Sequence, residues 1–446
     1  MLHLLRKITP HWAFQIYHRL LSWFSAVWYG HPSRQLIVIG VTGTNGKTTT
    51  SYLLAHALEA AGSKTGMTST ALFKIGDKEW TNDRKMTMLG RFQLQKFLRQ
   101  MVDAGCTYAV VETSSQGVVQ YRHRAVAYDA CVFTNLTPEH LEAHGGFENY
   151  KQSKIDFFRH TASLPRKVIA GKMIPRVAIV NADDPYAKEF SIHGFDRIVS
   201  FGLEHQCDVT ASGITESLEG VAFTVGSTAF SLQTPGHVTV LNALATIATA
   251  EVFAIGDGEI ASLLKNLPGM PGRYEQINEG QPFTVIVDYA YEPTALTALL
   301  DFITARKGTG RIIHVTGSAG GGRDVARRPL IGRLSGERCD ITIVTNEDPY
   351  DEDPNVIIRQ VAEGAVAAGK QEGRDLFSIL DRNAAIQKAI SLAQTGDIVL
   401  ITGKGNEPVI AGPNRSKTPF DDREAARKAL NARDVSSPIT LHSHDV

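Results

Sequence analysis

A short apolar run followed by a glycine-rich loop decides the fold: residues 36–58 read LIVIGVTGTNGKTTTSYLLAHAL. The run 36–41 is short and rich in β-branched residues, which is typical of a buried strand. The stretch 52–58 has the apolar spacing of a helix. A strand, a glycine loop and a helix in this order predict the first unit of a parallel sheet that is covered by helices.

The loop between this strand and this helix has the composition of a phosphate-binding loop. Glycines let backbone N–H groups and the helix N-terminus surround phosphates, with Lys47 reaching the outer phosphates and Thr48 placed to bind Mg²⁺. The generic pattern has glycine six positions before the lysine, where this chain has Val41 between Gly40 and Gly43. A Gly-Lys-Thr sequence directly after a strand still predicts that the loop binds a nucleotide rather than forming a plain turn.

Short β-branched runs alternate with helical stretches along most of the remaining chain, which predicts an α/β fold with parallel sheets. We expect strands at 36–41, 108–112, 130–134, 177–181, 284–289, 312–316, 340–345 and 397–402. Three further runs, 208–210, 220–225 and 229–232, are interpreted as antiparallel hairpins.

The Pro/Gly-rich segment 267–273 indicates a boundary between two domains. We therefore expect three parts. They are an amphipathic aromatic helical segment at 1–35, a P-loop-type parallel-sheet ATPase domain at 36–269, and a C-terminal Rossmann-like α/β domain at 270–446.

Composition excludes several classes of protein. The chain has 446 residues, 46 basic against 46 acidic, and four cysteines without a Cys-x-x-Cys pair. This argues against a disulfide scaffold, a zinc ribbon and a nucleic-acid partner, because a nucleic-acid binder carries a basic excess. The chain contains no run of about 18 apolar residues, so no membrane-spanning helix is predicted. Reduced cysteines and the absence of such a run lead us to expect a cytoplasmic protein.

Residues 1–30 contain three of the four tryptophans, mixed with other apolar residues and with Arg6, Lys7 and Arg19. This pattern is typical of an amphipathic helix that lies on a membrane surface. It is also typical of a helix that packs on the body of the protein or on a second subunit, which is the commoner arrangement for an aromatic stripe. Both interpretations stay open at this point.

The loop sequence Gly43-Thr44-Asn45-Gly46-Lys47-Thr48-Thr49 resembles the nucleotide loop of the Mur ligases, the ATP-dependent amide ligases that build the peptidoglycan stem peptide. Further stretches resemble the family's motifs in the family's order, and the similarity is greatest to the MurE type: ETSS at 112–115, TNLTPEHLE at 134–142, HG at 144–145 with Tyr150 and Lys154, NADDP at 181–185, PGR at 271–273, DYA at 288–290, GGRD at 321–324, and GKGNE at 403–407.

The resemblance implies an enzyme that transfers the γ-phosphoryl of ATP to a carboxylate and lets an amine attack the resulting acyl phosphate. It implies two Mg²⁺ ions, one held by Thr48 and the second by Glu112 and His140, with Lys154 carbamylated by CO₂ into an oxygen ligand. Lys47, Glu112, His140 and Lys154 are then the catalytic set. The implied ATP-binding residues are Gly43, Thr44, Asn45, Gly46, Lys47, Thr48, Thr49, Asn242, Arg273 and Asp288.

Three departures from the family pattern concern adenine and substrate contacts rather than phosphate chemistry: Thr239 stands where the family often has Asn, and Tyr291 and Gln116 each replace a His. The implied substrate-binding residues are Thr87, Ser114, Gln116, Arg323, Glu347, Asp348, Tyr350, Lys404 and Glu407.

The segment 347–354, EDPYDEDP, lies where MurE-type enzymes recognise the incoming amino acid. Tyr350 occupies the place of the Arg that would bind the distal carboxylate of meso-diaminopimelate, which argues against that substrate. The surrounding acids favour a cationic side chain such as lysine or ornithine.

The acceptor is less defined, because the family's UDP-binding domain precedes the nucleotide loop and only 35 residues precede the first strand here. We expect that domain to be missing. The stretch 85–92 lies where the family binds the muramoyl-peptide, so the acceptor could be a UDP-sugar-peptide, a lipid-linked intermediate or a free peptide. Two alternatives remain: a ligase for a pseudomurein, cyanophycin or polyglutamate-like acceptor, and a non-catalytic nucleotide-binding subunit of a complex.

Overall fold

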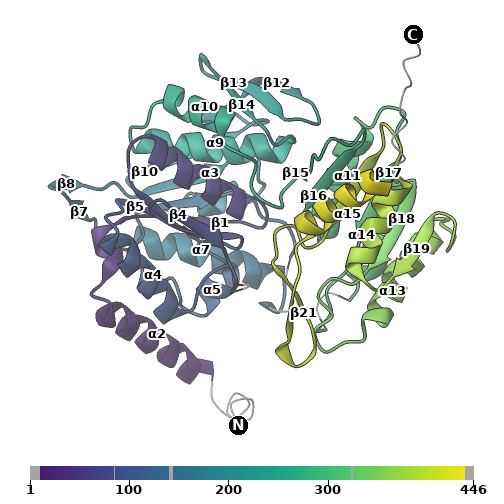
Figure 1. Ribbon diagram of the computed structural model, residues 1–446. Coiled ribbons are helices and arrows are strands. Elements are labelled where there is room, and N and C mark those ends of the chain that lie inside the picture. The colour runs from purple at the N-terminus through teal and green to yellow at the C-terminus, as the bar shows by residue number, and fades with distance from the viewer. Residues whose placement is uncertain (1–10, 85, 140–143, 323–324, 437–446) are drawn as a thin grey trace. The chain divides into compact units, whose positions relative to one another are not determined.

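The protein divides into two compact units, Met1–Pro268 and Gly269–Val446. The computed structural model describes residues 11–84, 86–139, 144–322 and 325–436. Both units have the α/β architecture expected from the alternating pattern, a parallel sheet with helices on its faces (Figure 1). Among the described residues, no helix is both long and apolar enough to cross a membrane.

The first unit is built on a nine-stranded sheet in the order β11-β10-β9-β6-β1-β5-β2-β3-β4. Its pairs are parallel except at β2–β3 and β3–β4, so one edge ends in an antiparallel meander. The strands are β1 Ile37–Thr42, β2 Thr65–Thr68, β3 Leu72–Ile75, β4 Lys78–Thr81, β5 Tyr108–Glu112, β6 Ala130–Phe133, β9 Val177–Asn181, β10 Arg197–Gly202 and β11 Val209–Thr210. Strand β1 is central, between β5 and β6, and all six of its residues are buried.

Helices cover both faces of this sheet, with α3, α9 and α10 on one side and α4, α5 and α7 on the other (Figure 1). The helices of the unit are α2 His11–Trp28, α3 Lys47–Ala60, α4 Arg91–Asp103, α5 Ser115–Val119, α7 Phe147–Ala162, α8 Ala187–Phe190, α9 His237–Val252 and α10 Asp257–Asn266, with a 3-10 turn at Pro32–Gln35. The main core lies between the sheet and α4, α5 and α7, where aromatic side chains of α7 pack on the middle strands.

Two smaller sheets complete the first unit. A two-stranded hairpin pairs β7 Val168–Ile169 with β8 Lys172–Met173. A three-stranded antiparallel sheet pairs β12 Ser212–Glu216, β13 Val221–Val225 and β14 Thr228–Leu232, which confirms the predicted hairpins at 220–225 and 229–232. The prediction for 208–210 was wrong: β11 joins β10 in parallel at the edge of the large sheet. The reason is that β10, which the pattern did not reveal, supplies a parallel partner only seven residues earlier in the chain.

The second unit contains a six-stranded sheet in the order β15-β16-β20-β17-β18-β19, parallel except for the edge strand β15. The strands are β15 Glu275–Gln276, β16 Thr284–Asp288, β17 Ile312–Thr316, β18 Ile341–Thr345, β19 Leu376–Ile379 and β20 Ile398–Thr402, with a separate hairpin of β21 Val409–Ala411 and β22 Lys417–Pro419. The helices are α11 Pro293–Thr304, α12 Arg327–Arg338, α13 Pro354–Ala367, α14 Arg382–Leu392 and α15 Asp422–Ser436, with a 3-10 turn at Pro413–Arg415. Apolar faces of α14 and α15 form the core with β16, β17, β18 and β20.

Two buried histidines make the first unit sensitive to acid. The rings of His123 and His160 lie 5.0 Å apart, and burial together with the charge of Arg124 lowers the pKa of His160 to about 4. A pKa below the ordinary value of 6.5 means that the folded state keeps its full stability above pH 6.5 and loses it as the pH falls toward 4. We expect His160 alone to reduce the free energy of unfolding by about 3 kcal/mol between pH 7 and pH 4. Urea unfolding at both pH values should show a shallower dependence for His160→Gln; an equal dependence in both proteins would contradict the assignment.

Candidate active site

The loop 43–46 connects β1 to α3 and has the backbone geometry that a phosphate site needs. Gly46 adopts a φ of +80°, and a Cβ there would lie 2.3 Å from the Asn242 side chain, so only glycine fits. Lys47 begins α3, and its Nζ donates to the Thr44 carbonyl at 2.6 Å. The loop therefore leaves backbone N–H groups and the positive end of a helix at the edge where β1 ends.

The loop after β6 holds the phosphate loop in place. The Asn45 N–H donates to the Asn135 side chain at 2.8 Å, and the Asn135 amide donates back to the Asn45 carbonyl at 3.1 Å. Thr134 Oγ1 also donates to the Asn45 carbonyl, at 2.6 Å. Thr44 Oγ1 accepts from the backbone N–H of Thr137 at 2.9 Å. These contacts attach the loop to a segment ninety residues away in sequence and hold its backbone in place.

Thr48 and Glu112, both implied as metal ligands, lie in direct contact. Thr48 Oγ1 donates to the Glu112 carboxylate at 3.0 and 3.1 Å, and both side chains are buried. Thr70, which the sequence did not single out, donates to the same carboxylate through its N–H at 2.6 Å and its hydroxyl at 2.9 Å. The Thr70 hydroxyl also bonds Thr87 Oγ1 at 3.0 Å. One hydrogen-bonded chain thus connects the phosphate loop to the stretch expected to bind the acceptor.

Lys154 lies next to the phosphate loop in the interior of the unit. Its Nζ donates to the Gly43 carbonyl at 2.5 Å and lies 4.5 Å from the centre of the Tyr150 ring. Burial first, and the charge of Lys47 second, lower the pKa of this amine well below its ordinary value. Burial therefore shifts Lys154 toward the uncharged amine, in contrast to an ordinary surface lysine.

Several other residues expected at the site contact the same loop or lie near it. Asn242, on α9, accepts from Thr50 Oγ1 at 3.2 Å and borders Gly46. Ser114 caps α5 by accepting from the Gly117 N–H, and Gln116 is exposed on the same helix. His144 bonds Ser115 Oγ at 3.1 Å, a pair that the motif HG did not reveal. His140 lies outside the described residues.

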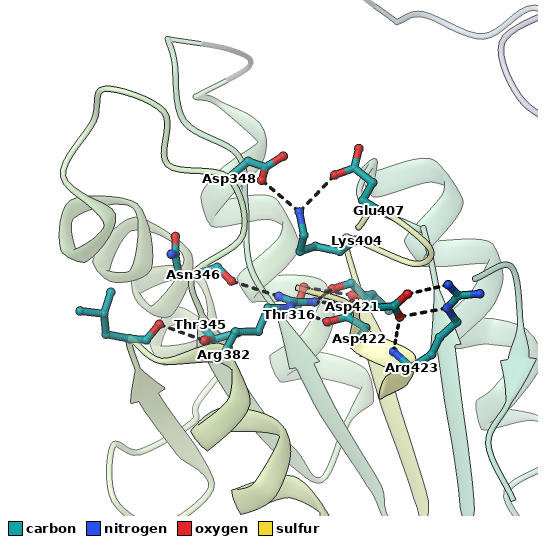
Figure 2. Close-up of polar contacts among 12 residues, drawn as sticks. Thr316, Thr345, Asn346, Asp348, Arg382, Lys404, Glu407, Asp421, Asp422 and Arg423 are labelled. Carbon is teal, nitrogen blue, oxygen red and sulfur yellow. Dashed lines mark hydrogen bonds and ion pairs between the residues drawn. The ribbon is translucent and has the colours of Figure 1, made fainter. Parts of the chain in front are cut away.

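In the second unit, Lys404 brings together two of the expected substrate residues (Figure 2). Its fully buried Nζ donates to Asp348 Oδ1 at 3.0 Å and to Glu407 Oε2 at 3.1 Å. Tyr289 donates to the other Glu407 oxygen at 3.2 Å. Asp348 also accepts from the Ala411 N–H at 2.7 Å. The loops after β16, β18 and β20 therefore meet in one charged cluster.

Most acids of the segment 347–353 pair with other groups of the protein, which reduces the number that could bind a cationic substrate. Glu352 pairs with the buried guanidinium of Arg328 at 2.9 Å, Asp353 caps α13, and Asp351 accepts from the Asn414 N–H at 2.8 Å. Glu347 differs, because it is buried and its Oε2 has no hydrogen-bond partner among the described residues. Burial raises the pKa of the Glu347 carboxyl, against the opposing charges of Lys404 and Arg327. Glu347 is therefore the acid of this segment with an oxygen that accepts no hydrogen bond in the described structure.

The two nucleotide residues expected in this unit lie side by side. The Arg273 guanidinium is 4.1 Å from the centre of the Tyr289 ring. Asp288 accepts from the N–H groups of Tyr274 at 2.7 Å and Ala290 at 2.6 Å, and burial raises the pKa of its carboxyl. Tyr350 has a left-handed backbone, with φ of 51°, and its N–H donates to the Ala411 carbonyl. Arg323 lies outside the described residues.

The donor set at Thr48 and Glu112 fits Mg²⁺, because hydroxyl and carboxylate oxygens are the ligands that this hard cation prefers. Across the part of the chain that the structure describes, no group of three His, Cys, Asp or Glu side chains forms a metal centre.

Comparison with known proteins identifies the family. Residues 41–250 match the Mur ligase middle domain, and residues 272–405 match the Mur ligase, glutamate ligase domain. A UDP-N-acetylmuramyl-tripeptide synthetase of Roseiflexus sp. (strain RS-1) is 40% identical over 92% of this chain and 81% of its own length. A UDP-N-acetylmuramoyl-L-alanyl-D-glutamate--2,6-diaminopimelate ligase of Geobacillus kaustophilus (strain HTA426) is 36% identical over 93% of this chain and 83% of its own.

Solved structures give the same result. One described as a UDP-N-acetylmuramoyl-L-alanyl-D-glutamate--2,6-diaminopimelate ligase aligns with a TM-score of 0.60 at 30% identity, covering 90% of this chain and 79% of that one. A folylpolyglutamate synthase of Mycobacterium tuberculosis shares the fold at 16% identity, with a TM-score of 0.65 over 86% of this chain and 92% of that one. The chain therefore belongs to the Mur ligase family and is an ATP-dependent ligase that joins a carboxylic acid to an amino acid.

Proposed function

We propose that the protein activates a carboxylate of a muramoyl-peptide-like acceptor as an acyl phosphate and joins it to a basic amino acid, in peptidoglycan biosynthesis. The observation that carries this proposal is the chain Thr48–Glu112–Thr70–Thr87, which connects the phosphate loop to the acceptor stretch. The γ-phosphoryl moves from ATP to a carboxylate oxygen and ADP leaves. The amine then attacks the acyl carbon and inorganic phosphate leaves. Because the reaction needs a supply of ATP, the proposed location is the cytoplasm.

The candidate site residues of the first unit each have a role in this proposal that their positions support. The N–H groups at the start of α3 and the amine of Lys47 would neutralise the phosphate oxygens of ATP, as a transferring phosphoryl group requires. Thr48 and Glu112 would hold Mg²⁺, which supplies positive charge over the phosphates when bound. Asn242 borders the loop on α9 and would contact the nucleoside. For Arg273 and Asp288, in the second unit, a nucleotide-binding role stays a prediction from the family motifs.

Lys154 has two features that support carbamylation. An uncharged amine is the form that reacts with CO₂: its nitrogen bonds the CO₂ carbon, one proton is released, and a carboxylate oxygen results. Burial lowers the pKa of Lys154, which favours the uncharged form, and the contact of its Nζ with the Gly43 carbonyl places it beside the phosphate loop. We therefore propose Lys154, with Glu112 and His140, as part of a second Mg²⁺ site.

Glu347 supports a basic amino acid as the substrate. Its buried carboxylate has an oxygen without a partner in the described structure, whereas the neighbouring acids are engaged. A buried carboxylate of this kind favours a cationic group that replaces its lost hydration. Glu407, held by Lys404 and Tyr289, lies in the same unit and would orient the attacking amine.

A phosphate-release assay across acceptors and amino acids tests this function. The acceptors are UDP-N-acetylmuramoyl-L-alanyl-D-glutamate, the free dipeptide and a lipid-linked form, and the amines are lysine, ornithine, meso-diaminopimelate and glycine. We expect release that requires ATP, Mg²⁺, an acceptor and an amine together, with lysine or ornithine at least about tenfold better than meso-diaminopimelate, since one charged contact is worth about 1.5–3 kcal/mol.

Lys47→Ala is the control for this assay, because any residual phosphate release would come from a contaminating ATPase. Absence of turnover with every pair would favour the non-catalytic nucleotide-binding subunit. Turnover only with a polyglutamate, cyanophycin or pseudomurein-like acceptor would identify a related ligase with another acceptor.

A further inference from the structure

Helix α2 presents its large apolar side chains to solvent. Ile16, Leu20, Trp23, Val27 and their neighbours Tyr17, Phe24 and Trp28 are all exposed, and Trp23 and Trp28 are 61% and 68% accessible. The spacing of three and four residues places them on one side of the helix. A surface helix ordinarily turns such a stripe toward the core, so a contiguous exposed stripe indicates a contact surface.

The opposite side of α2, with small and polar side chains, faces the protein. Ser22, Ser25 and Ala26 are buried, and Ser22 Oγ donates to the Tyr121 carbonyl at 2.9 Å. At the edge of the stripe, Phe24 lies 6.0 Å from Phe92 of α4, centre to centre. The helix is therefore anchored in an orientation that keeps the aromatic stripe outward.

Charge identifies the kind of partner. The first 58 residues contain no Asp or Glu, while Arg6, Lys7, Arg19 and Arg34 occur in the first 36. Arg19 lies on α2 itself, with its guanidinium 5.0 Å from the centre of the Tyr121 ring. A second copy packed on this face by a two-fold axis would bring like charges together. An anionic surface is complementary to it.

The surface beside α4 likewise combines apolar and cationic side chains. A cavity of about 670 Å³ is lined by Trp80, Leu89 and Phe97 together with Lys78, Arg84 and Lys96, and by no acidic residue. Lys96 follows Phe92 by about one turn of α4, so apolar and cationic groups extend from the α2 stripe along this helix.

We propose that α2 lies on an anionic phospholipid surface, with Trp23, Phe24 and Trp28 in the headgroup boundary. Tryptophan is suited to this position, because its ring is apolar and its N–H stays hydrated. No residue of α2 belongs to the site described above; its contact Phe92 is the last residue of the stretch 85–92 expected to bind the acceptor.

Vesicle binding of the full chain tests the proposal. We expect sedimentation with vesicles of phosphatidylcholine containing about one third phosphatidylglycerol, at least about tenfold above binding to pure phosphatidylcholine and reduced by salt. Tryptophan emission should shift to shorter wavelength on binding, since three of the four tryptophans lie in residues 12–28.

The variant Trp23→Ser with Trp28→Ser should lose about tenfold or more of this binding. The matched control is Val168→Ser with Met173→Ser, which removes two equally exposed apolar side chains on the β7–β8 hairpin and should bind like the original. Phosphate release by both variants in solution checks that they are folded. Equal binding by the two variants, or no binding by the original chain, would overturn the proposal. A dimer that dissociates in the tryptophan variant would assign the face to a second copy instead.

Discussion

Replacing Lys154 with alanine should reduce phosphate release by about 10²- to 10³-fold, the loss typical of one electrostatic group at a transferring phosphoryl. Lys154 is 1% exposed and bonds the Gly43 carbonyl, so its side chain acts inside the phosphate site rather than at the surface. If the working form is a carbamate, formate or acetate added to Lys154→Ala should restore part of the rate by supplying a carboxylate. Removing dissolved CO₂ and bicarbonate should slow the original enzyme.

The control for this experiment is on the same helix. Lys151→Ala removes a lysine one turn earlier that pairs with Glu148 and Glu189 near the surface, and it should leave the rate within about twofold, since such pairs are worth 0–1 kcal/mol. A rate restored by Lys154→Arg and not by formate would show that the positive charge is the working form. That result would contradict the carbamate and leave the ligase assignment intact.

The sequence predicted the parts of the site that depend on local order. The phosphate loop follows directly from the strand, glycine loop and helix at 36–58, and the motif at Glu112 places a carboxylate at the end of the adjacent strand. Parallel strands end at one edge of a sheet, so Thr48 and Glu112 meet as the motifs imply. Thr70 could not be predicted in the same way, because it contacts Glu112 across 42 residues through a short turn that carries no motif.

In the acidic segment 347–353, local sequence was a poor guide to the site. Seven residues with five acids indicate a site for a cation, yet the side chains that neutralise them lie elsewhere in the sequence. Arg328 precedes Glu352 by 24 residues and Lys404 follows Asp348 by 56. Only the fold brings these partners together, and it leaves Glu347 as the carboxylate with an unbonded oxygen in the described structure. Local charge density therefore overstated the number of groups that can bind an amine.

The second large effect concerns the stability of the second unit. Arg382 and Asp422 form a fully buried pair, with Nε to Oδ1 at 2.7 Å and Nη2 to Oδ2 at 2.8 Å (Figure 2). Arg382 also donates to the carbonyl of Asn346, which precedes Glu347, and to the carbonyl of Thr402, the last residue of β20. Asp422→Ala leaves a buried guanidinium without its counter-ion, and we expect it to lower the free energy of unfolding by about 3–5 kcal/mol.

The neighbouring acid Asp421 supplies the control. Comparing the two variants shows whether the loss of stability comes from the burial of the ion pair or from ion pairing alone. Asp421 also pairs with an arginine, Arg423, but both side chains are nearly one-fifth exposed; because Asp421 also accepts from the Arg423 N–H at the start of α15, Asp421→Ala should cost about 1–2 kcal/mol. Unfolding in urea should be followed by circular dichroism, because all four tryptophans lie in the first unit and do not report on the second. Equal losses for the two variants would show that the pair at Asp422 contributes no more than a surface ion pair. A larger loss at Asp422, partly recovered by Arg382→Met in the same chain, would show that the cost arises from the unpaired buried charge, because the double variant removes that charge while leaving the cavity.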